Sequence, residues 1–227
     1  MRTDKNSLNA LGGLVSIANH PRRWAAVALC GALACGTAAA TVQPRQSNIV
    51  ELVSKSELII RGTVTSVSDG IDARGLPYTE VTLRVAEAIR GEVGATYTFR
   101  QFGLIRPRDM GDGRLNVMVT PADWPTYQKG ESTILFLNRH AKWTGLQTTV
   151  GLGHGKFNVA LAGAANHANN AGLFEHVAVD SGLLAESDRR VMNTQKGAVN
   201  AEAFLRLVRK IVDGRWIEQG SMRNEQH

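Results

Sequence analysis

The stretch that decides the fold lies between residues 57 and 102, and its first run reads Leu58-Ile59-Ile60-Arg61-Gly62-Thr63-Val64-Thr65-Ser66-Val67. Apolar residues or glycine at every second position alternate there with mostly polar ones, which is typical of a β-strand with one buried face. Residues 80–85 and 96–100 alternate in the same way. Because one slip of register would move every apolar side chain into water, these runs predict three paired strands of one sheet.

The N-terminal forty residues have the pattern of an export signal. Arg22 and Arg23 precede an apolar run over 24–33, and small residues follow at 38–40. Positive charge, an apolar core and a small-residue cleavage site are the three parts of a secretory signal peptide. We therefore expect residues 1–40 to be an N-terminal extension and signal peptide, 41–214 a single β-rich domain with a C-terminal helix, and 215–227 a polar tail. An uncleaved membrane anchor is the alternative, but the run is short for a bilayer span of about 20 residues.

The cysteines support an envelope location. Cys30 and Cys35 are the only two in the chain, and both fall inside the predicted signal, so the mature protein would contain no disulfide. We expect a periplasmic or extracellular protein of a bacterium, with the general secretory and twin-arginine routes both left open. Four of the 26 Lys and Arg and one of the 20 acidic residues lie before residue 41, which leaves a net charge of +3. That charge is ordinary for solubility and predicts no specific nucleic-acid partner.

Two helices flank the predicted strands. Residues 46–56 have Asn48 placed as an N-cap and Glu51 three residues later, as in a capping box. Residues 201–213 carry the clearest amphipathic pattern, capped by Asn200 and ended by Gly214. Its apolar stripe consists of Phe204, Leu205, Val208, Ile211 and Val212.

Further strands are expected after residue 130. The continuous apolar run 133–137 predicts a central strand that is buried on both faces. Residues 146–150, 155–161 and 173–179 are also expected to be strands, and the second of these would point Phe157, Val159 and Leu161 inward. Residues 185–196 are read as a polar stretch between these strands and the C-terminal helix.

The irregular segment 103–130 is the candidate binding region. Long loops without secondary structure are uncommon in compact domains unless they are functional or disordered. The candidate contact residues combine arginine with amphipathic aromatic side chains, the types enriched at binding hot spots: Arg106, Arg108, Arg114, Trp124 and Tyr127. The alternative is structural, with Trp124 and Tyr127 closing one end of the sheet beneath the loop. A small apolar island, 117–119, lies in the same segment.

No catalytic or cofactor motif stands out in the chain. No serine lies in a Gly-x-Ser-x-Gly context, and no two histidines have the spacing that places two ligands on one metal. The glycine-rich run 151–155 precedes a strand and is read as a hairpin turn, and 109–113 is read as a Gly/Asp turn. We expect no metal site and no cofactor, and whether the protein is an enzyme stays open.

Several of these runs together resemble a set of uncharacterised exported bacterial β-domain proteins over residues 46–212. The residues that carry the resemblance are 56–64, 79–85, 89–91, 130–131, 134–137 and 155–157. The first half also resembles the opening strands of netrin-like and tissue-metalloproteinase-inhibitor modules, which implies an OB-type barrel. Those inhibitors chelate zinc through an N-terminal cysteine, and the predicted mature chain has none.

These observations lead to one expectation for fold and three for function. We expect an all-β fold, an OB-like partly closed barrel with a short N-terminal helix and a C-terminal amphipathic helix. The first functional hypothesis is an exported, non-catalytic binding or interaction module whose partner is an envelope or secreted protein. The alternatives are a protease-inhibitor-like partner of a secreted protease and an enzyme with an unrecognised carboxylate site. No transmembrane span is expected after removal of the signal.

Overall fold

A computed structural model describes residues 46–166, 172–194 and 197–225. These residues belong to one compact unit. The predicted signal peptide, residues 1–40, lies outside the described residues.

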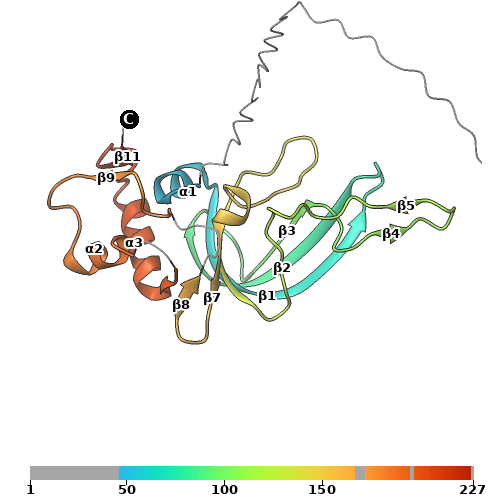
Figure 1. The fold of residues 1–227 in the computed structure, drawn as a ribbon, viewed down its shortest axis with the longest axis horizontal. Helices are drawn as coiled ribbons and strands as arrows, with labels where there is room; N and C mark the ends of the chain where they lie inside the picture. Colours follow the sequence, from blue (N-terminus) through green and yellow to red (C-terminus); the bar gives the residue numbers. More distant parts are fainter. Residues whose placement is uncertain (1–45, 167–171, 195–196, 226–227) are drawn as a thin grey trace, which may run out of the picture. The chain divides into compact units, whose positions relative to one another are not determined.

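The described chain is mostly β, with a seven-stranded antiparallel sheet and three short helices (Figure 1). The strand order is β10-β8-β7-β6-β1-β2-β3. The strands are β1 (Leu58–Ile71), β2 (Pro77–Arg90), β3 (Thr96–Phe102), β6 (Ser132–Leu137), β7 (Lys156–Val159), β8 (Ala164–Asn166) and β10 (Val199–Asn200). The β-rich prediction is confirmed, and so are the three strands expected between residues 57 and 102. The described residues form no closed or curled barrel, because β3 and β10 remain the two edges of the sheet.

The remaining elements are short. Two-stranded pairs are formed by β4 (Arg108–Asp109) with β5 (Leu115–Asn116), and by β9 (Val177–Val179) with β11 (Met222–Asn224). The helices are α1 (Ile49–Lys55), α2 (Glu186–Met192) and α3 (Ala201–Asp213), with a 3-10 helix η1 (Leu152–Gly155). Figure 1 shows α2 and α3 beside one end of the sheet and the β4–β5 hairpin beyond the other.

Strand β6 separates two hydrophobic cores. Ile134 and Phe136 face a core that includes α1 and α3, whereas Leu135 and Leu137 face a second core with side chains of β1, β2 and β3. Side chains of a strand alternate between the two faces of a sheet, so a continuous apolar run serves two cores at once. β6 is the fourth of seven strands, and the prediction of a central strand buried on both faces is confirmed.

The two predicted helices are also confirmed, including their caps. The side chain of Asn48 accepts a hydrogen bond from the N–H of Glu51 at the start of α1. The side chain of Asn200 does the same for the N–H of Ala203 at the start of α3. Such caps satisfy backbone donors that have no partner within the helix.

Two expected strands differ from the structure because their backbone groups bond elsewhere. Residues 146–150 form only an isolated bridge between Thr149 and Leu137. The N–H of Gln147 donates to the carbonyl of Arg100 in β3, and other residues of the segment bond to the end of β6. Of residues 173–179 only the last three form a strand, β9: the carbonyl of Leu173 accepts from the N–H of Ile49 in α1, and the φ of 56° at His176 is not that of a strand.

The C-terminal third differs in three further places. Leu161, expected to point inward, is fully exposed, because the chain turns there between β7 and β8. The expected polar stretch contains α2, which is held by its buried Val191 and by an ion pair between Asp188 and Lys210 at 2.6 Å. In the segment expected to be a polar tail, Met222 is fully buried in β11.

The alternation of β2 leads to a stability prediction. Leu83 is fully buried, whereas Thr82 is partly exposed and lies 2.9 Å from the hydroxyl of Thr98. Leu83→Ala is expected to cost about 2–5 kcal/mol, since it leaves a cavity, and Thr82→Ala well under that. Denaturant melts of the two variants measure the difference. Equal losses of stability would show that Leu83 does not lie on the buried face of β2 with Thr82 on the exposed face.

Candidate functional site

The candidate site is a projecting segment whose base is fixed to the sheet. We call residues 105–119 the hairpin arm. Before it, Leu104 is fully buried, and its N–H and carbonyl bond to Met118 and Thr120 at 2.9 Å each. Gly103 has a φ of 102°, and a Cβ there would lie 2.5 Å from Thr120, so only glycine fits without strain. The two ends of the arm are therefore held together at the sheet.

Asp69, near the end of β1, ties the first residues of the arm to the sheet. Its carboxylate accepts from the N–H of Ile105 at 2.8 Å and from the guanidinium of Arg108. A carboxylate that accepts from both a backbone N–H and a guanidinium fixes the orientation of the bound segment as well as its distance from the sheet. The arm is thus anchored through a side chain from a distant part of the sequence.

The tip of the arm is a turn closed by local hydrogen bonds. The N–H of Met110 donates to the carbonyl of Arg114 at 2.9 Å. Asp109 and Asp112 each accept a backbone N–H two residues ahead, in the way typical of Asx turns. The Gly/Asp turn predicted for residues 109–113 is confirmed.

The arm exposes an unusual number of apolar side chains. Large hydrophobic residues that are 36–62% exposed lie at six of its positions: Ile105, Met110, Leu115, Val117, Met118 and Val119. In the described part of the chain only two other large hydrophobic residues are exposed, Trp143 and Leu161, and each lies alone in a separate turn. Single exposed apolar residues are normal on protein surfaces, whereas a concentration of them in one element makes that element a candidate interaction surface.

The three arginines predicted as contacts all belong to this arm, but in different environments. Arg106 is exposed. Arg108 pairs with Asp69, and Arg114 pairs with Asp112. Pairing holds Arg108 against the end of β1, so the structure places this residue in the anchor of the arm.

The two predicted aromatic contacts lie outside the arm and are packed. Tyr127 is buried in the second core, edge-on to Phe99 with ring centroids 5.6 Å apart. Trp124 is half-buried against Phe102, with centroids 6.2 Å apart. The structure therefore does not bring these rings together with the arginines on one exposed surface. The exposed apolar residues of the arm were not predicted as contacts, although 117–119 were visible as an apolar island.

A largely covered cation, Lys156, lies beside Tyr127. The ammonium of Lys156 is 2.7 Å from the carboxylate of Glu131 and 4.6 Å from the centroid of the Tyr127 ring. Burial lowers the pKa of Lys156, and the hydrogen bond and charge of Glu131 oppose that shift. Burial also raises the pKa of Tyr127. The ion pair and the ring together compensate for the loss of water around Lys156, and they fix the 126–131 segment against β7.

The described histidines belong to no group of side chains that could hold a metal ion. In residues 46–166, 172–194 and 197–225 no group of three His, Cys, Asp or Glu side chains is placed to hold a metal ion. His154, expected in a hairpin turn, lies in η1 instead, and its Nδ1 accepts a hydrogen bond from the N–H of Ser47 at 3.3 Å. This bond requires Nδ1 to be unprotonated.

The His154 bond leads to a pH prediction. Burial lowers the pKa of His154 below its usual 6.5, against the opposing charges of Asp123 and Glu51. The unfolded chain therefore takes up this proton more readily, and stability is expected to fall as the pH drops below about 6.5. Asn keeps an acceptor near Nδ1 and does not titrate, so His154→Asn should flatten the decline between pH 7 and 5. Urea melts across this range check it, with His140→Asn as the control that should keep the decline.

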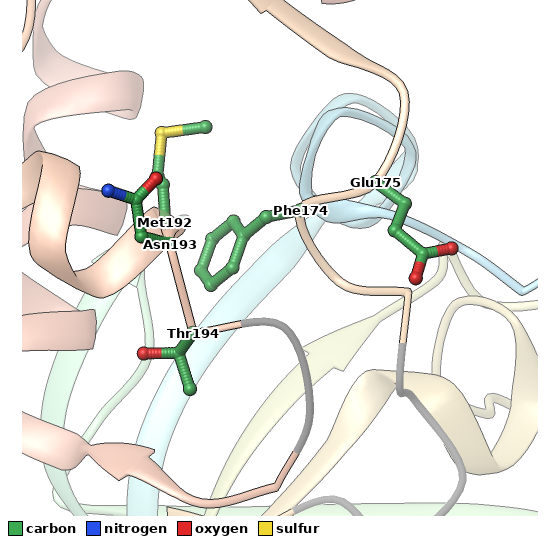
Figure 2. A pocket seen from close by; sticks show the side chains of 5 residues that line it. All are labelled: Phe174, Glu175, Met192, Asn193 and Thr194. Carbon is green, nitrogen blue, oxygen red and sulfur yellow. The ribbon is translucent and has the colours of Figure 1, made fainter.

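A pocket of about 270 Å³ lies between the segment before β9 and the end of α2. Figure 2 shows the ring of Phe174 directed toward Met192, Asn193 and Thr194, while the carboxylate of Glu175 is directed away from them. Catalysis needs polar groups that converge on one point. The polar side chains drawn in Figure 2 do not point to one common position.

Comparison with protein-family models, with curated proteins and with solved structures finds no match to this chain. Within the described residues, no helix is long and apolar enough to cross a membrane.

Proposed function

We propose that the protein is an exported, non-catalytic interaction module of the bacterial envelope, and that the hairpin arm inserts its apolar side chains into a groove on a partner protein. The observation that carries the proposal is the concentration of exposed apolar residues between Ile105 and Val119. Exposed apolar surface is unfavourable in water, so a partner that covers it gains about 25 cal/mol for each Å² removed from solvent.

The anchoring of the arm supports the same reading. Leu104, Gly103 and the Asp69–Arg108 pair fix its base on the sheet. A contact surface that is ordered before binding loses less conformational entropy when the complex forms. Loops and hairpins presented by a rigid sheet are common binding elements for this reason.

The charges of the arm favour a protein partner over a lipid surface. The turn at its end carries Asp109, Asp112 and Arg114, and all three are exposed or only partly covered. Insertion into a bilayer would take these charged groups into hydrocarbon, which costs several kcal/mol. A protein groove can cover the apolar sides of the arm and leave the charged turn in water, as interface rims do.

Site-specific photo-crosslinking in the source bacterium tests the proposal. A photoreactive amino acid is placed at position 115, 117 or 118 of the full-length chain, and at Trp143 or Leu161 as matched controls, since both are exposed apolar residues outside the arm. We expect one protein adduct of fixed mass from the arm positions and none from the controls. Adducts of equal yield from both sets, or none from the arm, would reject the proposed contact surface.

A further inference from the structure

A second pocket, separate from the hairpin arm, lies where α2, β10 and α3 meet and has a volume of about 260 Å³. Val191 and Val199 are buried residues of its lining, and Ala203 adds another apolar side chain. Pockets for drug-sized ligands are about 300–1,000 Å³, and this pocket, just below that range, has room only for a smaller molecule.

Two arginines line this apolar pocket, Arg190 from α2 and Arg206 from α3. No carboxylate residue is among the described residues that line it. Arg190 is 3.6 Å from Glu186, but both side chains are largely exposed, so that pair is weak and easily exchanged. The pocket therefore joins an apolar surface to two arginine side chains.

Arg206 differs from the other cations of α3. Arg209 pairs with Glu87, and Lys210 pairs with Asp188. In the described part of the chain, Arg206 has no carboxylate within ion-pair distance. Its charge is therefore available to an incoming anion.

Asn200 adds a neutral donor to the same pocket. Its Oδ1 caps α3 by accepting from the N–H of Ala203 at 2.9 Å. The side-chain NH₂ group is the part that is left to donate to a ligand. Arginine forks and an amide donor are suited to the two oxygens of a carboxylate.

We propose that this pocket binds a small carboxylate that carries a short apolar chain. The apolar chain packs against Val191, Val199 and Ala203, and the carboxylate lies between Arg190 and Arg206. Because arginine side chains are positively charged, the pocket should bind the ionised carboxylate more tightly than a neutral ligand with the same apolar chain.

Titration of the full-length chain with hexanoate, followed by backbone amide NMR shifts, tests this proposal. Saturable shifts are expected at the amides of Val191, Val199 and Ala203. Hexanamide, which has the same chain without the charge, is expected to bind about tenfold or more weakly, and inorganic phosphate, which lacks the chain, likewise. Equal binding of hexanoate and hexanamide, or no shift of these amides, would overturn the proposal.

Matched variants locate the carboxylate. Arg190→Gln and Arg206→Gln are each expected to weaken hexanoate binding about tenfold, with dispersed spectra that show an intact fold. Arg189→Gln removes the same charge from an exposed position of α2 that does not line the pocket, and should leave the affinity unchanged. Loss of binding in Arg189→Gln alone would contradict the assignment. Serine substitutions in the hairpin arm should leave the affinity for hexanoate unchanged. A failure of this proposal can therefore be told apart from a failure of the proposed function.

Discussion

Phe204→Ala is expected to lower the free energy of unfolding by about 3–5 kcal/mol. Phe204 is fully buried on α3, and its ring centroid lies 5.0 Å from that of Phe157 and 6.2 Å from that of Phe136. The three rings join α3 to β7 and β6, and Phe136 and Phe157 are themselves 5.7 Å apart. Truncation leaves a cavity at this junction and removes two aromatic contacts, each worth about 0.5–1.5 kcal/mol.

Equilibrium denaturation in urea measures this loss. Phe204→Leu keeps most of the apolar volume and should cost markedly less than Phe204→Ala. Leu161→Ala is the control, because Leu161 is fully exposed and its truncation should change stability by no more than about 0.5 kcal/mol. If Phe204→Ala lost no more than this control, α3 would not be packed on the sheet through Phe204.

The parts of the fold that could be predicted from the sequence are the elements whose formation depends on residues within the element itself. The alternation along β1, β2 and β3 and the continuous run of β6 follow from which faces are buried. The bounds of α3 follow from its apolar stripe, from Asn200 at its start and from Gly214 at its end. Each of these signals lies within the element that it predicts.

The parts that were missed depend on distant partners. Helix α2 has no long apolar stripe, and what holds it is Lys210 on α3 together with the buried side chain of Val191. β11 is a strand because Met222 meets Val179 of β9. Residues 146–150 have the pattern of a strand, but their backbone groups bond partly to Arg100 in β3 and partly to β6. They therefore pair continuously with neither strand. None of these contacts can be predicted from the residues next to it in the sequence, because each joins segments that are far apart in the chain.

The candidate site shows the same limit. The sequence identified segment 103–130 and the apolar island 117–119 within it. Which side chains face water there depends on the anchor at Asp69 and on the burial of Leu104. Tyr127 could not be assigned to the core from sequence, because an amphipathic ring suits both a binding surface and a core.

The hairpin arm gives the second large effect. The second variant replaces three exposed residues of the arm by serine at once: Leu115, Val117 and Met118. Its affinity for the partner protein identified by cross-linking is expected to fall about 100-fold or more, or ~3 kcal/mol. The reason is that binding energy at an interface concentrates in a few anchor residues. These side chains are exposed in the free protein, so their loss creates no cavity. The melting temperature should therefore stay within about 2 °C of the wild type.

Matched variants distinguish the arm from general surface apolarity. Trp143→Ser and Leu161→Ser remove the two exposed apolar residues outside the arm, and neither should change the affinity. Arg106→Ala tests one exposed arginine of the arm, and a smaller loss of affinity is expected there because a charge at an interface rim contributes little. Asp69→Asn weakens the anchor, and a loss of affinity there would arise from a less ordered arm.

Calorimetric titration of the purified partner into the wild-type chain and into the Leu115→Ser, Val117→Ser, Met118→Ser triple variant tests the central claim most directly. If the arm is the contact surface, the wild type binds and the triple variant, still folded with an unchanged melting temperature, binds about 100-fold more weakly. Equal affinity of the two folded proteins would contradict the account.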